Sequence, residues 1–390
     1  MRYFSMANWV AGLLAVVVGF TSSAAIVFQA AAAAGANNAE VSSWILALGV
    51  GTSLSSIGLS WYYRIPILTA WSTPGAALLV SSLAGFTLPQ AIGAFLFSGL
   101  LVFIVGITGW FERAMVYIPK ELAAAMLAGV LLHFGVNLFV ALQSEPLLVS
   151  AMIAGYFIGK RFYPRYMMMI VLIIGILVAW FHGLLIDQFW QFALTKPVWI
   201  TPEFTGPALI GVGIPLCVVT MTSQNIPGIA VMQAAGYKPS ISKVISCTGL
   251  TNLLIAPFGG FSCNLAAITA AICSGEEADI DPQKRYRAVY CAGIFYLLMG
   301  LFASTVVSLF SSFPQALILA IAGLALFVTI GTNLQSAFSS DEQREPALVT
   351  LMITASGINA FGVSAAFWGL LAGMISNQLL VNKQRVLLKN

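Results

Sequence analysis

The sequence predicts an all-α polytopic membrane protein with fourteen transmembrane segments arranged as a 7+7 inverted repeat. Three observations support this prediction: the composition, the alternation of apolar runs with polar breaks, and the placement of basic residues. Of the 390 residues, 59% are hydrophobic and 8% are charged, whereas a soluble domain carries about 25% charged residues. This composition cannot cover a water-facing surface, so it excludes soluble enzymes, nucleic-acid binders and secreted modules.

Apolar runs alternate with polar breaks, or with breaks rich in Pro and Gly, along the chain. A membrane-crossing helix needs about 20 residues, so this length allows about 12 to 14 crossings. The predicted spans are residues 8–34, 41–60, 66–84, 89–111, 120–141, 146–160, 165–182, 207–232, 240–256, 258–273, 286–309, 314–334, 346–361 and 363–381.

The basic residues test this number independently. Cytoplasmic loops of membrane proteins are enriched in Lys and Arg. With fourteen spans and a cytoplasmic N-terminus, Lys196 is the one basic residue of 17 that falls in an extracytoplasmic segment. The predicted topology therefore has both termini in the cytoplasm. The extracytoplasmic loop 183–206 then joins two seven-span repeats, 1–183 and 206–390.

Short motifs recur at corresponding places in the two halves. Residues 71–77 and 261–267 both read as an aromatic residue, Ser, three variable residues and Ala-Ala. The segments 128–138 and 322–334 share an Ala-Gly pair and a later Gly-x-Asn-Leu. Because seven is odd, the second half must enter the membrane from the opposite side. This predicts an inverted repeat with a binding site at the bilayer midplane.

Spans three and ten are predicted to be interrupted. In span three, an apolar segment precedes Pro74 and Gly75, and proline fits best in the first turn of a helix. In span ten, residues 257–261 cannot continue a helix, and Ser262 or Asn264 is expected to cap the next one. Each span is interpreted as a short extended segment followed by a half-helix. The inverted repeat directs both half-helix N-termini to the bilayer centre.

Two helix N-termini that face one point offer unpaired N–H groups and partial positive charge, which favours an anion. Since no charged side chain lies nearby, the site suits one carboxylate rather than a multivalent phosphate. Aromatic residues can form an apolar wall, and polar amides can face the cavity, although a single Ser, Thr or Asn can equally serve only as a helix–helix hydrogen bond. The candidate substrate-binding residues are Ser22, Ser23, Gln29, Trp71, Thr73, Pro74, Gly75, Gln224, Asn225, Phe261, Ser262, Cys263 and Asn264.

The titratable residues limit the mechanism. The sequence has two histidines and no metal- or phosphate-binding motif, so we expect no metal, no cofactor and no enzymatic activity. None of the 13 acids lies at a predicted midplane position, although proton-coupled carriers often use a buried carboxylate. Glu121 and His133 are the candidates for a proton-carrying side chain.

Two further patterns are interpreted as structural. Gly369 and Gly373, and the series that includes Gly99 and Gly106, are expected to allow close helix packing. The run Met167–Met169 is expected to face lipid or fill the core.

Three segments resemble the signatures of the BenE family of bacterial benzoate/proton symporters. They are Leu68–Leu79 (LTAWSTPGAALL), Thr220–Ala230 (TMTSQNIPGIA) and Ala266–Cys273 (AAITAAIC). The resemblance extends over essentially the whole chain. It implies proton-coupled uptake of benzoate across the bacterial inner membrane, in a fold distantly similar to that of the nucleobase and sulfate carriers.

The resemblance also implies two domains and a set of site residues. In that fold a core domain moves against a gate domain, and these would comprise, respectively, residues 8–118 with 206–312 and residues 119–183 with 313–382. The substrate site of uracil-type relatives falls here on Thr73, Gln224, Ser262 and Cys263. The relatives use glutamates where this chain has Gln224 and Cys263. An anionic substrate explains the difference, because a glutamate would repel a carboxylate.

Several alternatives stay open. The chain could carry another small anion or a nucleobase-like ring compound, or act as an uncoupled exchanger. A passive channel would need a continuous polar stripe, whereas the polarity here is concentrated at the predicted midplane. The expected partners are the substrate, protons and the lipid bilayer, with no nucleic acid. Relatives of this fold are often dimers, so a homodimer is a further open expectation.

Overall fold

A computed structural model describes residues 4–109, 119–185, 192–266, 268–276, 278–358, 360–361 and 365–387. Within these residues the protein is helical, with one two-stranded sheet. Six of the described helices are long and apolar enough to cross a membrane, or eight when each of two bent helix pairs counts as one crossing. The structure therefore supports a helical membrane protein, whereas the fourteen-span count stays a prediction.

Each predicted span overlaps a described helix or a strand with a half-helix. The first half contains α1 (Met6–Ala33), α2 (Asn38–Tyr63), β1 (Thr69–Trp71), α3 (Thr73–Ser82), α4 (Leu88–Thr108), α6 (Lys120–Ser144), α7 (Pro146–Phe162), the 3₁₀ turn η1 (Pro164–Tyr166) and α8 (Met167–Phe181). The second half begins with α9 (Gly206–Ala208), the π turn η2 (Leu209–Gly213), α10 (Ile214–Thr220), the π turn η3 (Met221–Asn225), α11 (Ile226–Ala234), α12 (Ile241–Ile255) and the 3₁₀ turn η4 (Ala256–Phe258). It continues with β2 (Cys263–Leu265), α13 (Ile268–Ser274), the 3₁₀ turn η5 (Pro282–Lys284), α14 (Tyr286–Leu301), α15 (Ala303–Ser311), α16 (Gln315–Ala337), α17 (Arg344–Ser356) and α18 (Ala365–Leu387).

The two interrupted spans contain the expected extended segments and half-helices. β1 pairs with β2 in antiparallel fashion, with Trp71 opposite Cys263, and the half-helices α3 and α13 follow the strands. Side-chain amides complete the hydrogen bonding of β2. Asn225 accepts from the N–H of Leu265, and Asn252 both accepts from the N–H of Cys263 and donates to its carbonyl. Without these partners, the strand would leave backbone groups unpaired in an apolar interior.

The second half-helix starts later than expected. α13 begins at Ile268 and Asn264 lies within β2, so neither Ser262 nor Asn264 directly precedes the helix, and the predicted cap is wrong. The strands begin 194 residues apart and the half-helices 195 residues apart. The motif match that equates Trp71 with Phe261 uses a spacing of 190 residues, so it is out of register with the backbone.

Prolines explain the irregular course of the segment 206–234. A proline lacks an N–H, and its ring crowds the carbonyl four residues earlier, which disturbs the helix at that point. The π turns η2 and η3 end two residues before Pro215 and Pro227, respectively. The second of these turns holds the polar residues 222–224. Such π turns are frequent at functional sites.

Two of the glycines predicted to allow close helix packing lie at such contacts. A Cβ on Gly106 of α4 would collide with the backbone of Ser246 in α12. A Cβ on Gly373 of α18 would collide with the side chain of Thr350 in α17. These glycines therefore allow close approach of neighbouring helices, as small residues do in membrane proteins.

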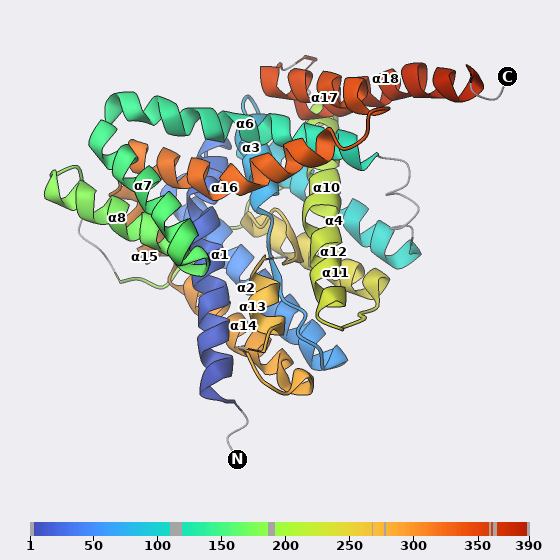
Figure 1. The fold of residues 1–390 in the computed structure, drawn as a ribbon. Coiled ribbons are helices and arrows are strands. Elements are labelled where there is room, and N and C mark those ends of the chain that lie inside the picture. Colours follow the sequence, from blue (N-terminus) through green and yellow to red (C-terminus); the bar gives the residue numbers. More distant parts are fainter. Residues whose placement is uncertain are drawn as a thin grey trace.

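The contacts divide the helices into two groups. α6, α7, α8, α16, α17 and α18 contact one another along the upper and left sides of the view in Figure 1. α1, α2, α3, α4 and α10 to α14 form the second group. The groups meet where α1 contacts α8 and α16 and where α3 contacts α6. Apart from a few terminal residues, the first group lies within the ranges predicted for the gate domain and the second within those predicted for the core domain. The division into two domains and their relative movement both stay predictions.

Candidate functional site

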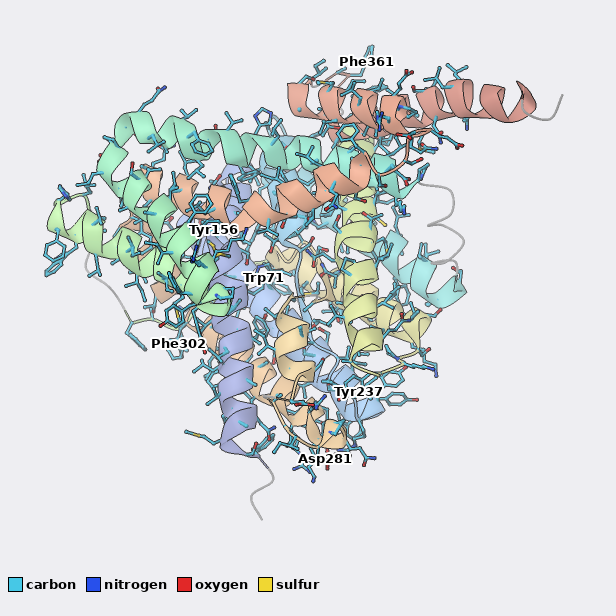
Figure 2. The ribbon with its side chains drawn as sticks, in the orientation of Figure 1. Trp71, Tyr156, Tyr237, Asp281, Phe302 and Phe361 are labelled. Atoms are coloured by element: carbon cyan, nitrogen blue, oxygen red, sulfur yellow. The ribbon has the colours of Figure 1, made fainter. Side chains whose placement is uncertain are left out.

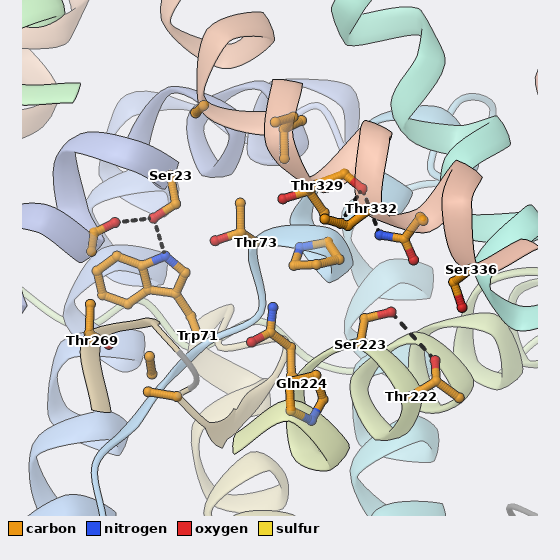
Figure 3. A pocket seen from close by; sticks show the side chains of 18 of the residues that line it. Ser23, Trp71, Thr73, Thr222, Ser223, Gln224, Thr269, Thr329, Thr332 and Ser336 are labelled. Atoms are coloured by element: carbon orange, nitrogen blue, oxygen red, sulfur yellow. Dashed lines mark hydrogen bonds between the residues drawn. The ribbon is translucent and has the colours of Figure 1, made fainter. Parts of the chain in front are cut away.

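A cavity of about 440 Å³ lies where the two helix groups meet (Figure 3). One side of its wall comes from α1, β1, α3, η3, α11, α13 and α14, and α16 forms the opposite side. The lining residues are Gly19, Ser23, Ala70, Trp71, Thr73, Pro74, Thr222, Ser223, Gln224, Pro227, Ala266, Thr269, Tyr296, Ala325, Leu326, Thr329, Thr332, Asn333 and Ser336. None of them has a charged side chain, so the described wall is neutral.

Trp71 provides a fixed aromatic surface in this wall, near the middle of the molecule (Figure 2). Its indole N–H donates to the hydroxyl of Ser23 at 2.7 Å. The ring of Tyr296 lies 5.6 Å away at an interplanar angle of 74°, an edge-to-face geometry that aromatic pairs favour. Ser23 follows a 45° bend in α1 and also bonds the carbonyl of Gly19. Trp71 therefore offers its ring to a ligand, and its N–H is already used.

The N-terminus of α3 reaches the cavity through Thr73. The first N–H groups of a helix have no partner within it. Ser72 accepts from the N–H of Gly75 through its side chain and from that of Ala76 through its carbonyl, and Pro74 has no N–H. Thr73 therefore supplies the remaining N–H of this first turn, together with its own hydroxyl.

Gln224 extends its amide into the cavity from the π turn η3. Figure 3 shows this amide below Thr73 and to the right of Trp71. The structure gives the amide no hydrogen bond to any described residue, and Gln224 lines the cavity. Its donor and acceptor are therefore available to a ligand.

The opposite wall is a polar stripe on α16. Thr329, Thr332, Asn333 and Ser336 all line the cavity, and their spacing places them on one face of a helix. Asn333 donates to the carbonyl of Thr329 at 2.8 Å. None of these four residues is among the candidates predicted from the sequence, although polar residues at positions i, i+3, i+4 and i+7 of an apolar helix could have identified them.

Five of the candidate substrate-binding residues line this cavity: Ser23, Trp71, Thr73, Pro74 and Gln224. The side chain of Ser22 lies outside the described part of the structure.

The remaining candidates have other positions. Phe261 packs against Trp44 and Phe95, and Ser262 shares a 2.8 Å hydrogen bond with Thr220. The other five are buried or support the backbone near the site. Gly75 is held by the cap of α3, Asn225 and Cys263 belong to the hydrogen bonding around β2, and Gln29 and Asn264 each have a buried polar atom without a hydrogen-bond partner in the described structure.

The two candidate proton carriers lie away from the cavity wall. Glu121 is buried in the first turn of α6. The Nε2 atom of His133 lies 2.9 Å from the carbonyl oxygen of Ala355, which links α6 to α17. The described residues contain no group of three or more His, Cys, Asp or Glu side chains that could hold a metal ion.

Replacing Ser23 with alanine tests the hydrogen bond that holds Trp71. The substitution leaves the buried indole N–H without its partner, so we expect the free energy of unfolding to fall by about 1–3 kcal/mol. Thermal unfolding in detergent measures this loss. S308A is a matched control, because its hydroxyl bonds the carbonyl of Thr305 in its own helix. Equal stability of S23A and S308A would contradict the role of Ser23.

Comparison with known proteins places this geometry in context. A family model described as "Benzoate membrane transport protein" (BenE) matches residues 2–379. "Inner membrane protein YdcO" of Escherichia coli is 46% identical over 375 residues, which cover 96% of this chain and 96% of that protein. "Benzoate membrane transport protein" of Acinetobacter baylyi is 38% identical over 378 residues, which cover 97% of this chain and 96% of that protein.

Solved structures share the fold at low sequence identity. The transmembrane domain of the cyanobacterial bicarbonate transporter BicA matches with a TM-score of 0.63 and 13% identity, covering 95% of this chain and 97% of that chain. SLC26A9 matches with a TM-score of 0.64 and 12% identity, covering 96% of this chain and 65% of that chain. These likenesses show that the chain has a membrane transporter fold.

Proposed function

The chain belongs to the benzoate membrane transport protein (BenE) family, and from this premise we propose that it is a secondary active transporter that imports benzoate, or a similar aromatic monocarboxylate, together with protons. The observation that carries the proposal is a neutral cavity that combines an aromatic wall with unused hydrogen-bond donors. The relative named a benzoate membrane transport protein supports the substrate. The relative named an inner membrane protein supports a place in the bacterial inner membrane.

The aromatic wall suits the ring of the substrate. Trp71 and Tyr296 form an edge-to-face pair, and both line the cavity. A third ring placed beside them gains buried apolar area and favourable ring geometry. Ala70 and Leu326 add apolar surface.

The donors suit a carboxylate. Thr73 contributes an N–H and a hydroxyl at the positive end of α3, and Gln224 contributes its amide N–H groups. Hydrogen bonds to an ionised acceptor are about twice as strong as neutral ones, and the helix N-terminus favours negative charge. We propose that the substrate binds as the carboxylate, with its charged end at Thr73 and Gln224 and its ring toward Trp71.

The proton has no carrier in the cavity wall, because no described lining residue is a carboxylate or an imidazole. Glu121 and His133 are the proposed carriers outside the wall. The alternative is that the substrate brings its own proton.

The position of the cavity suits alternating access. Its wall is divided between α16 of one helix group and elements of the other group. Movement of the proposed core domain against the proposed gate domain would carry the substrate past α16 while its contacts with the core elements stay the same. The substrate would then be exposed to the other side of the membrane.

Uptake of labelled benzoate into proteoliposomes, with and without an imposed inward proton gradient, tests the proposal. We expect saturable accumulation that an uncoupler abolishes. Glu121→Gln or His133→Ala is expected to remove the response to the gradient if that residue carries the proton. Saturable exchange that ignores the gradient would rule out coupling. If folded protein takes up no benzoate, direct uptake of labelled bicarbonate and of labelled uracil would distinguish the small-anion and ring-compound alternatives.

A further inference from the structure

A second and larger cavity adjoins the candidate site. Its volume is about 710 Å³, and it lies among α1, α8, α13 and α16. Thr269, Ala325 and Thr329 line both this cavity and the candidate site. The two spaces are therefore neighbours that are separated by these three small side chains.

The second cavity follows α13 away from the candidate site. Thr269 lies in the first turn of this half-helix, and Gly275 and Glu276 follow its end at Ser274. All seven residues of α13 together rise about 10 Å along the helix axis. The chain then continues to Asp281, which lies at the lower edge of the molecule in Figure 2, whereas Trp71 lies near the middle. The cavity thus extends from the centre of the protein toward one of its ends.

The wall of this cavity is mostly apolar and includes thioethers. Met167, Met168 and Met169 at the start of α8 line it, together with Ile272 and Val328. Met168 belongs to the buried core and Met167 packs against it, as expected for core-filling residues, and all three methionines also line the cavity. Methionine sulfur makes favourable contacts with aromatic rings, and its flexible side chain adapts to a moving neighbour.

We infer that this second cavity is the passage through which the aromatic substrate moves between the candidate site and the end of the protein that carries the loop after α13. Thr269 and Thr329 form the narrow point between passage and site, and the methionines contact the ring during transit. This inference rests on the proposed function for the identity of the substrate. The three lining residues that the cavities share, and the course of the second cavity along α13, support the route itself.

A cysteine at Ala271 tests the passage. Ala271 is exposed and lines the second cavity but not the candidate site. We expect a water-soluble trimethylammonium methanethiosulfonate reagent to modify the Ala271→Cys protein in proteoliposomes and to stop its benzoate uptake. Excess benzoate is expected to slow the modification. Mass spectrometry counts the added groups against the unsubstituted protein, whose five cysteines provide the background.

Two variants complete the experiment. Ile173→Cys is the matched control, because Ile173 is 51% exposed on α8 and lines neither cavity; its uptake should be unchanged after treatment. Val328→Cys replaces Ala271→Cys if the latter does not fold, since Val328 also lines only the second cavity. A cysteine that does not react, or one that is modified while uptake continues, would overturn the passage. Absence of benzoate uptake in the untreated, unsubstituted protein would instead overturn the proposed function, and the extent of modification would still test the passage.

Discussion

Replacing Gln224 with glutamate is expected to abolish benzoate uptake at neutral pH without unfolding the protein. The two side chains have nearly the same shape, so the substitution changes charge and hydrogen-bond donors and little else. In the proposed binding mode the new carboxylate would lie next to the carboxylate of benzoate, within a cavity whose described wall has no cation to offset it. Either one of the two carboxylates must then take up a proton, or the two negative charges repel each other.

Charge repulsion and protonation cost a similar amount of binding free energy. Two like charges about 4 Å apart repel by about 4 kcal/mol at an effective dielectric constant of about 20. Protonating a glutamate with an ordinary pKa of about 4.3 at pH 7 also costs about 4 kcal/mol. Since every 1.4 kcal/mol is a factor of about ten, the apparent affinity for benzoate should fall by a factor of several hundred. The loss should shrink as the pH falls toward the pKa of the introduced glutamate.

The measurement is benzoate uptake or binding by the Gln224→Glu protein across a range of pH. Benzamide, a neutral analogue, should retain its ability to bind, because it brings no charge to the site. Gln233→Glu is the matched control, since Gln233 is exposed on α11. Undiminished benzoate uptake by Gln224→Glu at pH 7 would contradict binding of the anion and would favour a substrate that brings its own proton.

Part of the cavity wall at the candidate site could be predicted because local rules determine it. Proline at the second position of a half-helix, next to Thr73, identifies the N-terminus of α3 from the sequence alone. Pro227 marks the π turn that turns Gln224 into the cavity. An aromatic residue before such a break, Trp71, is a reasonable wall residue. These features depend on a few neighbouring residues, so one sequence is enough to recognise them.

The segment around β2, in the second repeat, could not be located in the same way. The similarity of the segments that follow Trp71 and Phe261 depends on Ser and Ala, which are small and frequent throughout the chain. The true alignment depends on which residues of β2 face β1, and that register is fixed by contacts between distant segments. Asn252 and Asn225 settle it by hydrogen bonding the backbone of β2 from two other helices. No local pattern around Phe261 reveals those partners.

The polar stripe of α16 shows a different limit. Thr329 and Asn333 lie on one helical face with Thr332 and Ser336, and a search for polar periodicity in apolar helices would have found them.

The number of membrane crossings is harder to predict from the sequence. α7, α8 and α17 have 17, 15 and 13 residues, fewer than the roughly 20 that a perpendicular crossing needs. Helix tilt and position decide whether such helices cross the membrane, and hydropathy does not contain that information.

Replacing Gly259 with alanine is expected to disturb the entry to β2 more than any comparable substitution on the surface. Gly259 has a φ of +95°, a region that residues with a side chain rarely adopt. A Cβ at this position would also overlap the indole ring of Trp44, which is fully buried and packs edge-on against Phe95. The turn after α12 therefore depends on the absence of a side chain.

The expected loss of stability has two causes, backbone strain and displacement of Trp44. A matched pair of variants separates them. Gly85 has a φ of +91° and has nothing within 4 Å of an added Cβ, so Gly85→Ala carries only the backbone strain, about 1 kcal/mol. Gly259→Ala carries the same strain and must also displace Trp44, and overpacking of a core adds about 1–3 kcal/mol. Thermal unfolding in detergent should therefore rank Gly259→Ala well below Gly85→Ala.

Benzoate uptake should be impaired in Gly259→Ala more than in Gly85→Ala. Gly259 lies shortly before β2, and Trp44 packs against Phe261 in the segment that leads into this strand. Displacement of Trp44 would shift the strand that pairs with β1 and, with it, the position of Trp71 in the cavity wall. We expect Gly259→Ala protein that does fold to take up benzoate poorly and Gly85→Ala protein to take it up normally. Equal stability and equal uptake in the two variants would show that the turn can move without disturbing the sheet, and the rigid support of Trp71 by β2 would then be wrong.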